Sequence, residues 1–363
     1  MASTSLTATD VRPGRPQGFE VLRIVAAAAV VVSHSYSLLG PDGGTVIPVA
    51  PFGDFVFDLG RVGVIVFFVV SGYLVCGSWL ADPRPLSFAA KRAFRLMPGL
   101  LVMLLLVTFV VVPLITSSDA YWSDPQTYLY FVRNLLVFPY TYDLPGAFEG
   151  NPSQAVNGVL WTLGVEVLAY VMLAVAGVRG WLRSPARLAV VAAVLAVVGW
   201  RLISTSVLDG ALVPVALRVE LVAYFFAAAT IRSSRWRPDA RAAAASLAVL
   251  VLLMALGASL SILMVPLGTV MVVYLGTRQW DGARAVTRLG DPSYGTYIYG
   301  FVLQQLIISA FGPLESRPLF AVVSVVASLA VGYLSWHVVE RRALRYGRGL
   351  VLRSPSRTQP RTS

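Results

Sequence analysis

Several residue types that often carry chemistry are scarce in this sequence. It has one cysteine, Cys76, and two histidines, His34 and His337. A single cysteine excludes a disulfide within the chain, and so few sulfur and imidazole groups leave little material for a zinc-type site. Lysine is nearly absent, because Lys91 is the one lysine among 29 basic residues. We therefore expect no metal centre, and any catalysis must depend on few groups.

Charge is scarce as well. Only 13% of the 363 residues are charged, 57% are apolar, and the mean hydropathy is +0.73. A soluble domain has roughly 45–50% apolar and about 25% charged residues. This composition excludes a disordered chain and argues against a cytosolic enzyme. It is typical of a membrane protein.

Apolar runs of the length that crosses a bilayer recur along the whole chain. Only residues 257–259 separate the seventh and eighth runs. A single helix through both runs would be about 50 Å long, too long for an ordinary bilayer, so two short spans with a tight turn are predicted. The sequence therefore predicts an all-α polytopic bundle of about ten transmembrane helices. The ten segments are Phe19 to Leu39, Val62 to Leu80, Pro98 to Ile115, Gly158 to Val178, Leu188 to Ile203, Ala211 to Ile231, Ala243 to Leu256, Leu260 to Leu275, Tyr294 to Phe311 and Leu319 to Val339.

The basic residues alternate between the two sides of this topology. With ten spans, 24 of the 29 lie on one side. Cytoplasmic loops collect Arg and Lys, so we predict that both termini are cytoplasmic and that the protein is a multi-pass protein of the cell inner membrane. The net charge of +11 is then a topology signal, and no nucleic-acid partner is expected.

The predicted organisation has one domain. We expect a disordered cytoplasmic N-terminus over residues 1–18, a single transmembrane domain over residues 19–340, and a basic cytoplasmic tail over residues 341–363. The tail is rich in arginine and suits contact with anionic lipid. The longest stretch outside the membrane, residues 116–157, is expected to face outward and to include a surface helix over residues 128–137.

Ionisable groups inside a span are costly, so they are candidates for function. Arg23 and His34 share the first span, and their spacing of eleven residues puts them on one helix face, about 16 Å apart. Glu166 lies in the fourth span, about eight residues from its outer edge. Its counted depth is near that of His34, which predicts a carboxylate and imidazole pair. Structural alternatives remain: Arg23 can reach the headgroups, and the other two can bond neighbouring helices.

The third span begins with a basic cluster. Arg92 and Arg95 are one turn apart on one helix face, so both guanidinium groups can bind the same phosphate groups. An ordinary cytoplasmic charge cluster is the structural alternative. In the second span, Ser71 and Gly72 offer a small surface where a ligand or another helix can approach closely. Arg218 and Glu220 in the sixth span are interpreted as contacts between helices.

Five short stretches, in the same order, resemble the membrane-bound acyltransferase-3 family, whose members include O-acyltransferases of surface polysaccharides and antibiotics. Most of the chain is covered. One departure is Gly300, where many relatives carry a histidine; Gln304 or Gln305 is then expected to line the site. The stretches are the basic residue and histidine of Arg23 to His34, GVIVFFVVSGYL from Gly63, KRAFRLMP from Lys91, WTLGVE from Trp161, and SYGTYIY from Ser293 followed by SWHVVE from Ser335.

The resemblance implies transfer of an acyl group, expected to be acetyl, from cytoplasmic acyl-CoA to a hydroxyl of a carbohydrate or glycosylated acceptor. Acyl-CoA is then a cosubstrate, and no permanently bound cofactor is expected. Arg23, Arg92 and Arg95 would bind the CoA phosphates. His34 would act as general base and Glu166 would orient it, with an acyl-histidine intermediate as an alternative. Residues expected to line the site are Ser71, Trp161, Tyr294 and Gln304.

Two other function classes remain open from the sequence. A membrane glycosyltransferase with a lipid-phosphate sugar donor would use acids of the first outer loop, where Asp42, Asp54 and Asp58 lie. A proton-coupled transporter or flippase would use His34, Glu166 and Glu220 as a relay. The absence of internal repeats argues against a transporter. The sequence does not select the acceptor, the side from which it enters, the acyl chain length or the oligomeric state.

Overall fold

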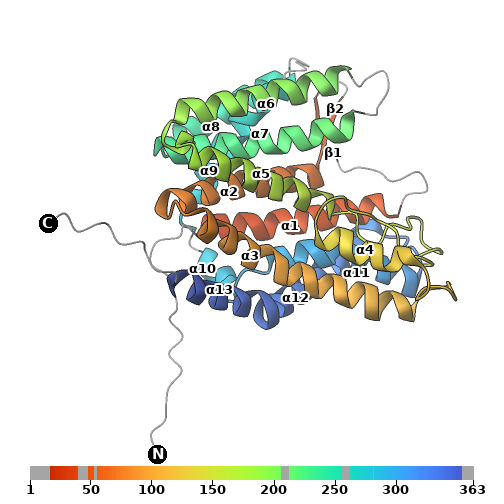
Figure 1. Cartoon of the computed structure of the whole chain (residues 1–363). Helices are drawn as coiled ribbons and strands as arrows, with labels where there is room; N and C mark the ends of the chain where they lie inside the picture. Colours follow the sequence, from red (N-terminus) through yellow and green to blue (C-terminus); the bar gives the residue numbers. More distant parts are fainter. Residues whose placement is uncertain are drawn as a thin grey trace, which may run out of the picture.

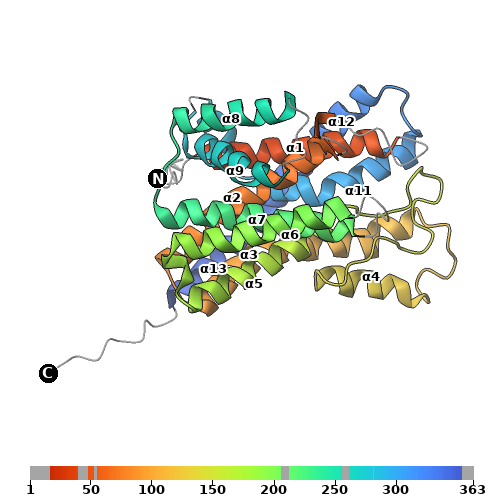
Figure 2. The same cartoon turned by 90° about the horizontal axis from the view of Figure 1, so that it is seen from above.

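A computed structural model gives the fold. It describes residues 17–39, 48–52, 55–205, 212–255, 261–280 and 282–353. The helices run side by side along a common direction and form one bundle (Figures 1 and 2). The predicted all-α class is confirmed.

The helices follow the predicted spans closely. They are α1 (Gly18–Ser37), α2 (Leu59–Ala81), α3 (Pro85–Leu106), α4 (Pro125–Leu135), α5 (Trp161–Val178), α6 (Pro185–Thr205), α7 (Val213–Ser234), α8 (Ala240–Ala255), α9 (Ser261–Thr277), α10 (Ala283–Thr287), α11 (Ser293–Phe311), α12 (Arg317–Ser335) and α13 (Arg341–Arg353). A short π-helical turn, η1 (Val107–Val111), and a 3-10 turn, η2 (Val112–Leu114), extend α3. Another 3-10 turn, η3 (Trp181–Arg183), joins α5 to α6, and a π-helical turn, η4 (Trp336–Glu340), joins α12 to α13.

The expected surface helix is present as α4, three residues earlier than predicted at its start. The structure also contains a hairpin that the sequence did not predict, formed by β1 (Pro48–Phe52) and β2 (Phe55–Asp58), which pair antiparallel between α1 and α2. Most of the expected disordered N-terminus of residues 1–18, namely residues 1–16, lies outside the described residues, as do Asp42 and Asp54, whereas α1 already begins at Gly18.

Within the described ranges, seven helices are long and apolar enough to cross a membrane, and two shorter apolar helices, α8 and α9, accompany them. The chain is therefore a multi-pass membrane protein. α8 and α9 are separate helices that pack on each other, which confirms two segments in place of one. α11 is not among these apolar helices, but 13 of its 19 residues are buried by neighbouring helices, so it needs less lipid-compatible surface.

α1, α2 and α7 form the centre of the bundle. α2 packs on both α1 and α7, α6 covers α7, and α11 with α12 covers the other side of α1. Gly72 lets α2 and α7 approach closely, since a Cβ at this position would lie 2.1 Å from the carbonyl oxygen of Phe225. Gly72 thus has the helix-packing role that the sequence left open for it.

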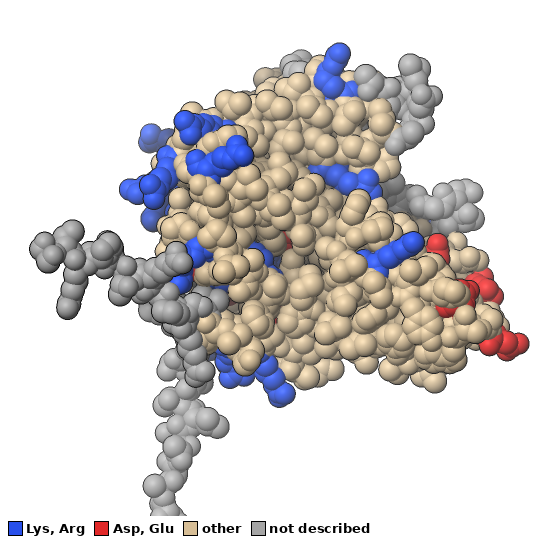
Figure 3. Space-filling model, viewed as in Figure 1, with Lys and Arg blue, Asp and Glu red and all other residues tan. Residues whose placement is uncertain are grey.

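Charge separates the two ends of the bundle. Lys and Arg side chains gather at the end drawn on the left of Figure 3, and Asp and Glu side chains at the end drawn on the right. The first, which we call the basic end, holds the connections from α2 to α3 and from α5 to α6 (Figure 1). The second, the acidic end, holds the segment from α3 to α5, where Asp119, Asp143 and Glu149 are exposed.

Candidate active site

A cavity of about 100 Å³ lies between α1, α2, α3, α5 and α11. Six of the residues singled out in the sequence line it together: Arg23, Ser71, Arg92, Arg95, Glu166 and Tyr294. They come from five helices that are far apart in sequence. The cavity is therefore the candidate site, and it faces the half of the bundle where α1 and α3 begin.

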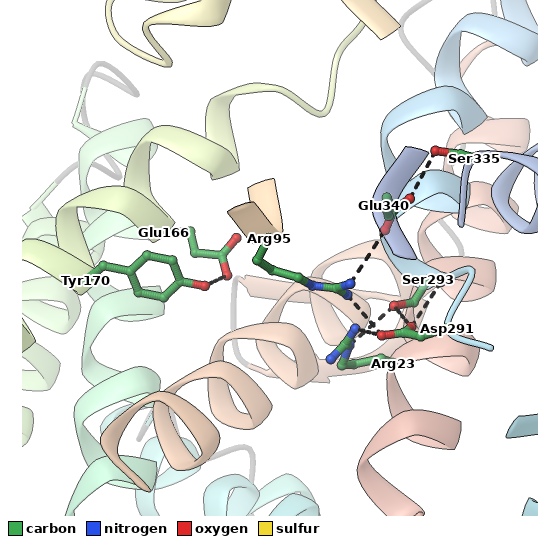
Figure 4. A network of polar contacts seen from close by, with 8 residues as sticks. All are labelled: Arg23, Arg95, Glu166, Tyr170, Asp291, Ser293, Ser335 and Glu340. Atoms are coloured by element: carbon green, nitrogen blue, oxygen red, sulfur yellow. Dashed lines mark hydrogen bonds and ion pairs between the residues drawn. The ribbon is translucent and has the colours of Figure 1, made fainter. Parts of the chain in front are cut away.

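Two of the cavity arginines are held by carboxylates (Figure 4). Arg23 of α1 forms an ion pair with Asp291, which directly precedes α11. Arg95 of α3 donates to the same Asp291 oxygen at 3.0 Å and lies 3.5 Å from a Glu340 oxygen of η4. Asp291 thus bridges α1 and α3. We call Arg23, Arg95, Asp291 and Glu340 the cavity network.

Asp291 is well set for this role. The hydroxyl of Ser293 donates to its other oxygen at 2.6 Å, and the Ser293 backbone N–H at 3.3 Å. Burial disfavours the charged carboxylate, but the positive charges of Arg23 and Arg95 and the Ser293 hydrogen bonds outweigh it and hold the pKa of Asp291 at about 2. Asp291 is therefore ionised at neutral pH.

Arg92 differs from its two neighbours. No carboxylate among the described residues forms an ion pair with it, and its buried Nε has no hydrogen-bond partner there. Its guanidinium carbon lies 5.8 Å from the ring centroid of Tyr170 on α5, a cation–π contact. Arg92 therefore lines the cavity with hydrogen-bonding capacity that the protein does not use.

Glu166 also faces the cavity. One of its oxygens accepts a hydrogen bond from Tyr170 and lies 3.2 Å from the Ser71 hydroxyl. Tyr170 thereby touches both the cation of Arg92, with its ring, and the anion of Glu166, with its hydroxyl. The cavity thus offers an unpaired guanidinium beside the ring of one tyrosine and a carboxylate at its hydroxyl.

The structure does not bring His34 and Glu166 together. His34 packs its ring edge-to-face on Phe301, with centroids 5.2 Å apart, and it does not line the cavity. Its neighbour Ser33 lies against Gly60 at the start of α2. Ser71, which contacts Glu166, follows eleven residues later on α2, about 16 Å along the helix axis. Glu166 therefore lies about three turns nearer the basic end than His34.

This difference in depth has a cause in the chain before α5. Asn157 is fully buried and donates a hydrogen bond of 2.8 Å to the carbonyl oxygen of Ile298 in α11. The chain therefore enters the bundle in a non-helical conformation and begins α5 well below the acidic surface. A count of residues from the predicted outer edge underestimates the depth of Glu166.

The other expected lining residues have different surroundings. Tyr294 lines the cavity, and its hydroxyl donates to the Leu96 carbonyl oxygen at 2.8 Å. Gln304 does not line the cavity. Its amide donates to the carbonyl oxygen of Val31, one turn before His34, and to the hydroxyl of Ser35, the residue after His34. Trp161 lies at the first turn of α5, outside the cavity lining.

Comparison with known proteins agrees with this site. Residues 17–337 match the acyltransferase domain that defines the acyltransferase 3 family. The chain belongs to the acyltransferase 3 family. It is an O-acyltransferase, which replaces the glycosyltransferase and transporter alternatives. No solved structure matches the chain.

Two relatives show how far the similarity extends. The chain is 28% identical over 337 residues to an O-acetyl transferase of Shigella phage Sf6, covering 90% of this chain and 95% of that protein. It is 31% identical over 200 residues to nodulation protein 10 of Rhizobium leguminosarum bv. viciae, covering 52% of this chain and 51% of that one. The first match extends over nearly the whole bundle.

In this acyltransferase, three residues at or beside the cavity were not predicted from the sequence: Tyr170, which lines it, and Asp291 and Glu340, which pair with its arginines. Glu340 ends the stretch SWHVVE, so an acid at the end of an apolar span was a visible signal. Asp291 precedes the ninth span and looks like a loop acid until the fold places it between two arginines. Tyr170 lies one helical turn after Glu166, a spacing at which side chains on a helix meet.

Proposed function

We propose that this enzyme transfers an acetyl group from acetyl-CoA to a hydroxyl of a carbohydrate acceptor. The observation that carries the proposal is the cavity with three arginines, one of which, Arg92, has no carboxylate partner among the described residues. A half-buried guanidinium without a carboxylate partner suits a phosphate group, which accepts two parallel hydrogen bonds from its planar fork. The name of the phage relative, O-acetyl transferase, supports acetyl as the group.

The donor enters from the cytoplasm in this proposal. The basic end of the bundle carries the Arg-rich connections, and such loops remain on the cytoplasmic side. Both chain termini are then cytoplasmic, and the membrane is the cell inner membrane. Because the cavity faces that end, CoA needs no passage across the bilayer to reach Arg92.

Arg92 is the main phosphate contact, and Arg23 and Arg95 add positive potential. Their charges are partly neutralised by Asp291 and Glu340, which hold both guanidinium groups at the cavity wall. Asp291 and Glu340 are thus positioning residues, and their negative charges offset those of Arg23 and Arg95. A bound phosphate then finds guanidinium groups already oriented, which lowers the entropy cost of binding.

His34 is proposed as the general base. Arg23 and His34 are about 16 Å apart along α1, comparable to an extended pantetheine arm, so a donor bound by its phosphates can present its thioester near His34. Tyr297 lines the cavity and Phe301 follows one turn later against His34. The rings of Phe67, Tyr297 and Phe301 lie along this route.

The chemistry is a direct acyl transfer. The imidazole of His34 accepts the hydroxyl proton while the acceptor oxygen forms a bond to the thioester carbonyl carbon. The carbon–sulfur bond breaks, CoA leaves as the thiolate, and the proton passes from imidazolium to the thiolate. An acyl-histidine intermediate, with the imidazole as nucleophile, is the alternative route to the same products. Glu166 belongs to the donor cavity in this scheme, where it positions Tyr170 beside Arg92.

Donor binding is tested first. Thermal unfolding of purified protein is measured with increasing acetyl-CoA or free CoA, because both carry the same phosphates. Ligand at about 100 times its dissociation constant stabilises by roughly 2.7 kcal/mol. We expect a saturable rise in Tm that Arg92→Ala weakens at least about tenfold, because charge-assisted hydrogen bonds contribute about 1.5–3 kcal/mol.

The matched control is Arg179→Ala, an exposed arginine at the same end of the bundle that does not line the cavity. It should bind the donor as the unmodified protein does. Equal binding by the Arg92→Ala variant would remove the phosphate assignment. No rise with either ligand, in protein that unfolds cooperatively, would refute the CoA donor.

His34→Ala tests the base. We expect kcat for acetyl transfer to fall by about 10²- to 10⁴-fold while acetyl-CoA still raises Tm, because His34 lies outside the donor cavity. Radiolabelled acetyl-CoA and a carbohydrate acceptor panel give the readout. A variant with normal kcat would exclude His34 from proton transfer.

A further inference from the structure

Three aromatic side chains and one arginine meet at the acidic end, outside the donor cavity. Tyr140 and Tyr142 lie in the segment between α4 and α5, Trp161 begins α5, and Arg218 lies in the second turn of α7. We call these four residues the aromatic cluster. Trp161 and Arg218 lie in different predicted spans, and no sequence pattern joins them.

Arg218 is the centre of the aromatic cluster. Its Nη2 donates a hydrogen bond to the Tyr140 hydroxyl. Its guanidinium carbon lies 5.8 Å from the ring centroid of Tyr140 and 5.9 Å from that of Trp161. The rings of Tyr140 and Tyr142 are 5.2 Å apart and inclined at 58°. Two kinds of aromatic ring therefore surround one guanidinium group.

No carboxylate among the described residues forms an ion pair with Arg218. Glu220, two residues later on α7, forms an ion pair with Arg61 of α2. Arg218 is thus a partly buried cation without an anionic partner among the described residues. Like Arg92 in the donor cavity, it has capacity for an anionic ligand.

The aromatic cluster is close to the proposed base. Trp161 is one turn along the chain from Gly158, where a Cβ would lie 2.7 Å from the ring of Phe301. That ring packs on His34. All four cluster side chains are half-buried, so each combines a fixed position with some exposed surface. Trp161 is followed directly by Thr162 and Leu163, which line the donor cavity, so a ligand at the aromatic cluster lies close to both the cavity and Phe301.

Tyrosine and tryptophan present broad, rigid apolar faces with polar edges, which suit the apolar face and the hydroxyls of a sugar ring. An arginine beside them adds bidentate recognition of a carboxylate or phosphate. We propose that the aromatic cluster binds a pyranose ring that carries a negative charge, and that this ring belongs to the acceptor. The inference rests on the carbohydrate acceptor of the proposed function.

Binding of simple sugars tests the proposal without knowledge of the natural acceptor. Saturation-transfer NMR on protein in nanodiscs would compare methyl glucuronoside, glucose 1-phosphate and the neutral methyl glucoside. We expect the two anionic probes to bind at least about tenfold more tightly than the neutral one, because a charge-assisted pair is lost with the latter. The better of the two anionic probes identifies carboxylate or phosphate as the preferred group.

Three variants locate the binding. Arg218→Gln should remove the preference for anionic probes, and Trp161→Ala should weaken all three. Tyr140→Phe keeps the ring and removes only the hydroxyl that accepts from Arg218, so it should retain sugar binding. The matched control is Arg201→Gln on α6, whose guanidinium carbon lies 5.7 Å from the Trp200 ring in a similar arrangement, outside the aromatic cluster. It should bind all probes as the unmodified protein does.

Equal binding of charged and neutral probes, no saturation by any probe, or the same losses in Arg201→Gln would overturn the proposal. The acetyl-CoA rise in Tm, measured on the same samples, shows that each variant is folded. It also separates the two proposals. If acetyl-CoA still raises Tm but no sugar binds, only the proposal for the aromatic cluster is refuted. If sugars bind but acetyl-CoA does not raise Tm, only the proposal of a CoA donor is refuted.

Discussion

Two sets of buried ion pairs hold this bundle together, and they differ in what lies beside them. In the cavity network, Arg23 of α1 and Arg95 of α3 pair with two carboxylates. These are Asp291, just before α11, and Glu340 of η4. The second set is the single pair of Arg61 on α2 and Glu220 on α7. The first lines a cavity, whereas the second is enclosed between two helices of the centre. The same chemistry therefore serves ligand binding in one place and helix packing in the other.

The difference teaches how to distinguish the two roles. In both sets the charges of opposite sign balance, so charge alone does not mark a site. What marks the cavity is the extra, unpaired guanidinium of Arg92 beside the cavity network. Removing a partner from the enclosed pair should cost stability above all, and changes around the cavity should alter donor binding or its pH dependence.

The largest stability effect is expected for Arg61→Met. This change leaves the Glu220 carboxylate buried without its cation, which costs about 3–5 kcal/mol. Thermal unfolding in detergent and the yield of folded protein would measure it. The double variant Arg61→Met/Glu220→Leu removes both charges and should recover most of the loss. A single variant as stable as the unmodified protein would show that the pair has no structural role.

A smaller effect, on the order of 2 kcal/mol, is expected for Asp291→Asn. The folded-state pKa of Asp291, about 2, lies below its ordinary value, so its contribution is complete above about pH 4 and is lost as the pH falls toward 2. Between pH 6 and pH 3, the unmodified protein should lose Tm more steeply than the variant. Asp119→Asn, an exposed acid at the other end, should keep the unmodified slope. Parallel curves for Asp291→Asn would contradict the assigned ion pairs.

The smallest effect is expected for Tyr170→Phe. The change removes the hydrogen bond to Glu166 but keeps the ring beside Arg92. The binding free energy of the donor is therefore expected to weaken by about 1 kcal/mol. KM for acetyl-CoA should rise a few-fold with little change in Tm. Tyr130→Phe is the control, because the hydroxyl of Tyr130 is buried without a hydrogen-bond partner among the described residues. If both variants raise KM equally, Tyr170 has no specific role in the cavity.

Hydropathy and charge predicted most of the fold because the bilayer imposes both. Apolar length gave the helices, and each of the ten predicted segments contains a helix in the described residues. The arginines of the cavity were also predictable, since a basic residue at the start of a span is visible in the sequence. Residue spacing then correctly placed Arg92 and Arg95 on one face toward the cavity.

The depth of Glu166 in the bundle and the ion-pair partners of the cavity arginines were not predictable in the same way. Pairing His34 with Glu166 assumed that spans begin in one plane, but Asn157 brings the chain deep into the bundle before α5 starts. Asp291 has the sequence appearance of a loop acid, and its burial depends on contacts with α1 and α3 that no local pattern encodes. These residues required the packing of several helices to be known at once.

The rings between the cavity and His34 have a consequence for the permeability of the membrane. Phe67 packs edge-to-face on Tyr297, and Phe301 packs on His34, so aromatic surface lies between the polar cavity and the base. Packed aromatic surface of this kind resists wetting and therefore resists the passage of ions. In the proposed scheme, with the donor bound from one face and the acceptor from the other, an acetyl group would cross the bilayer without protons leaking along the same route.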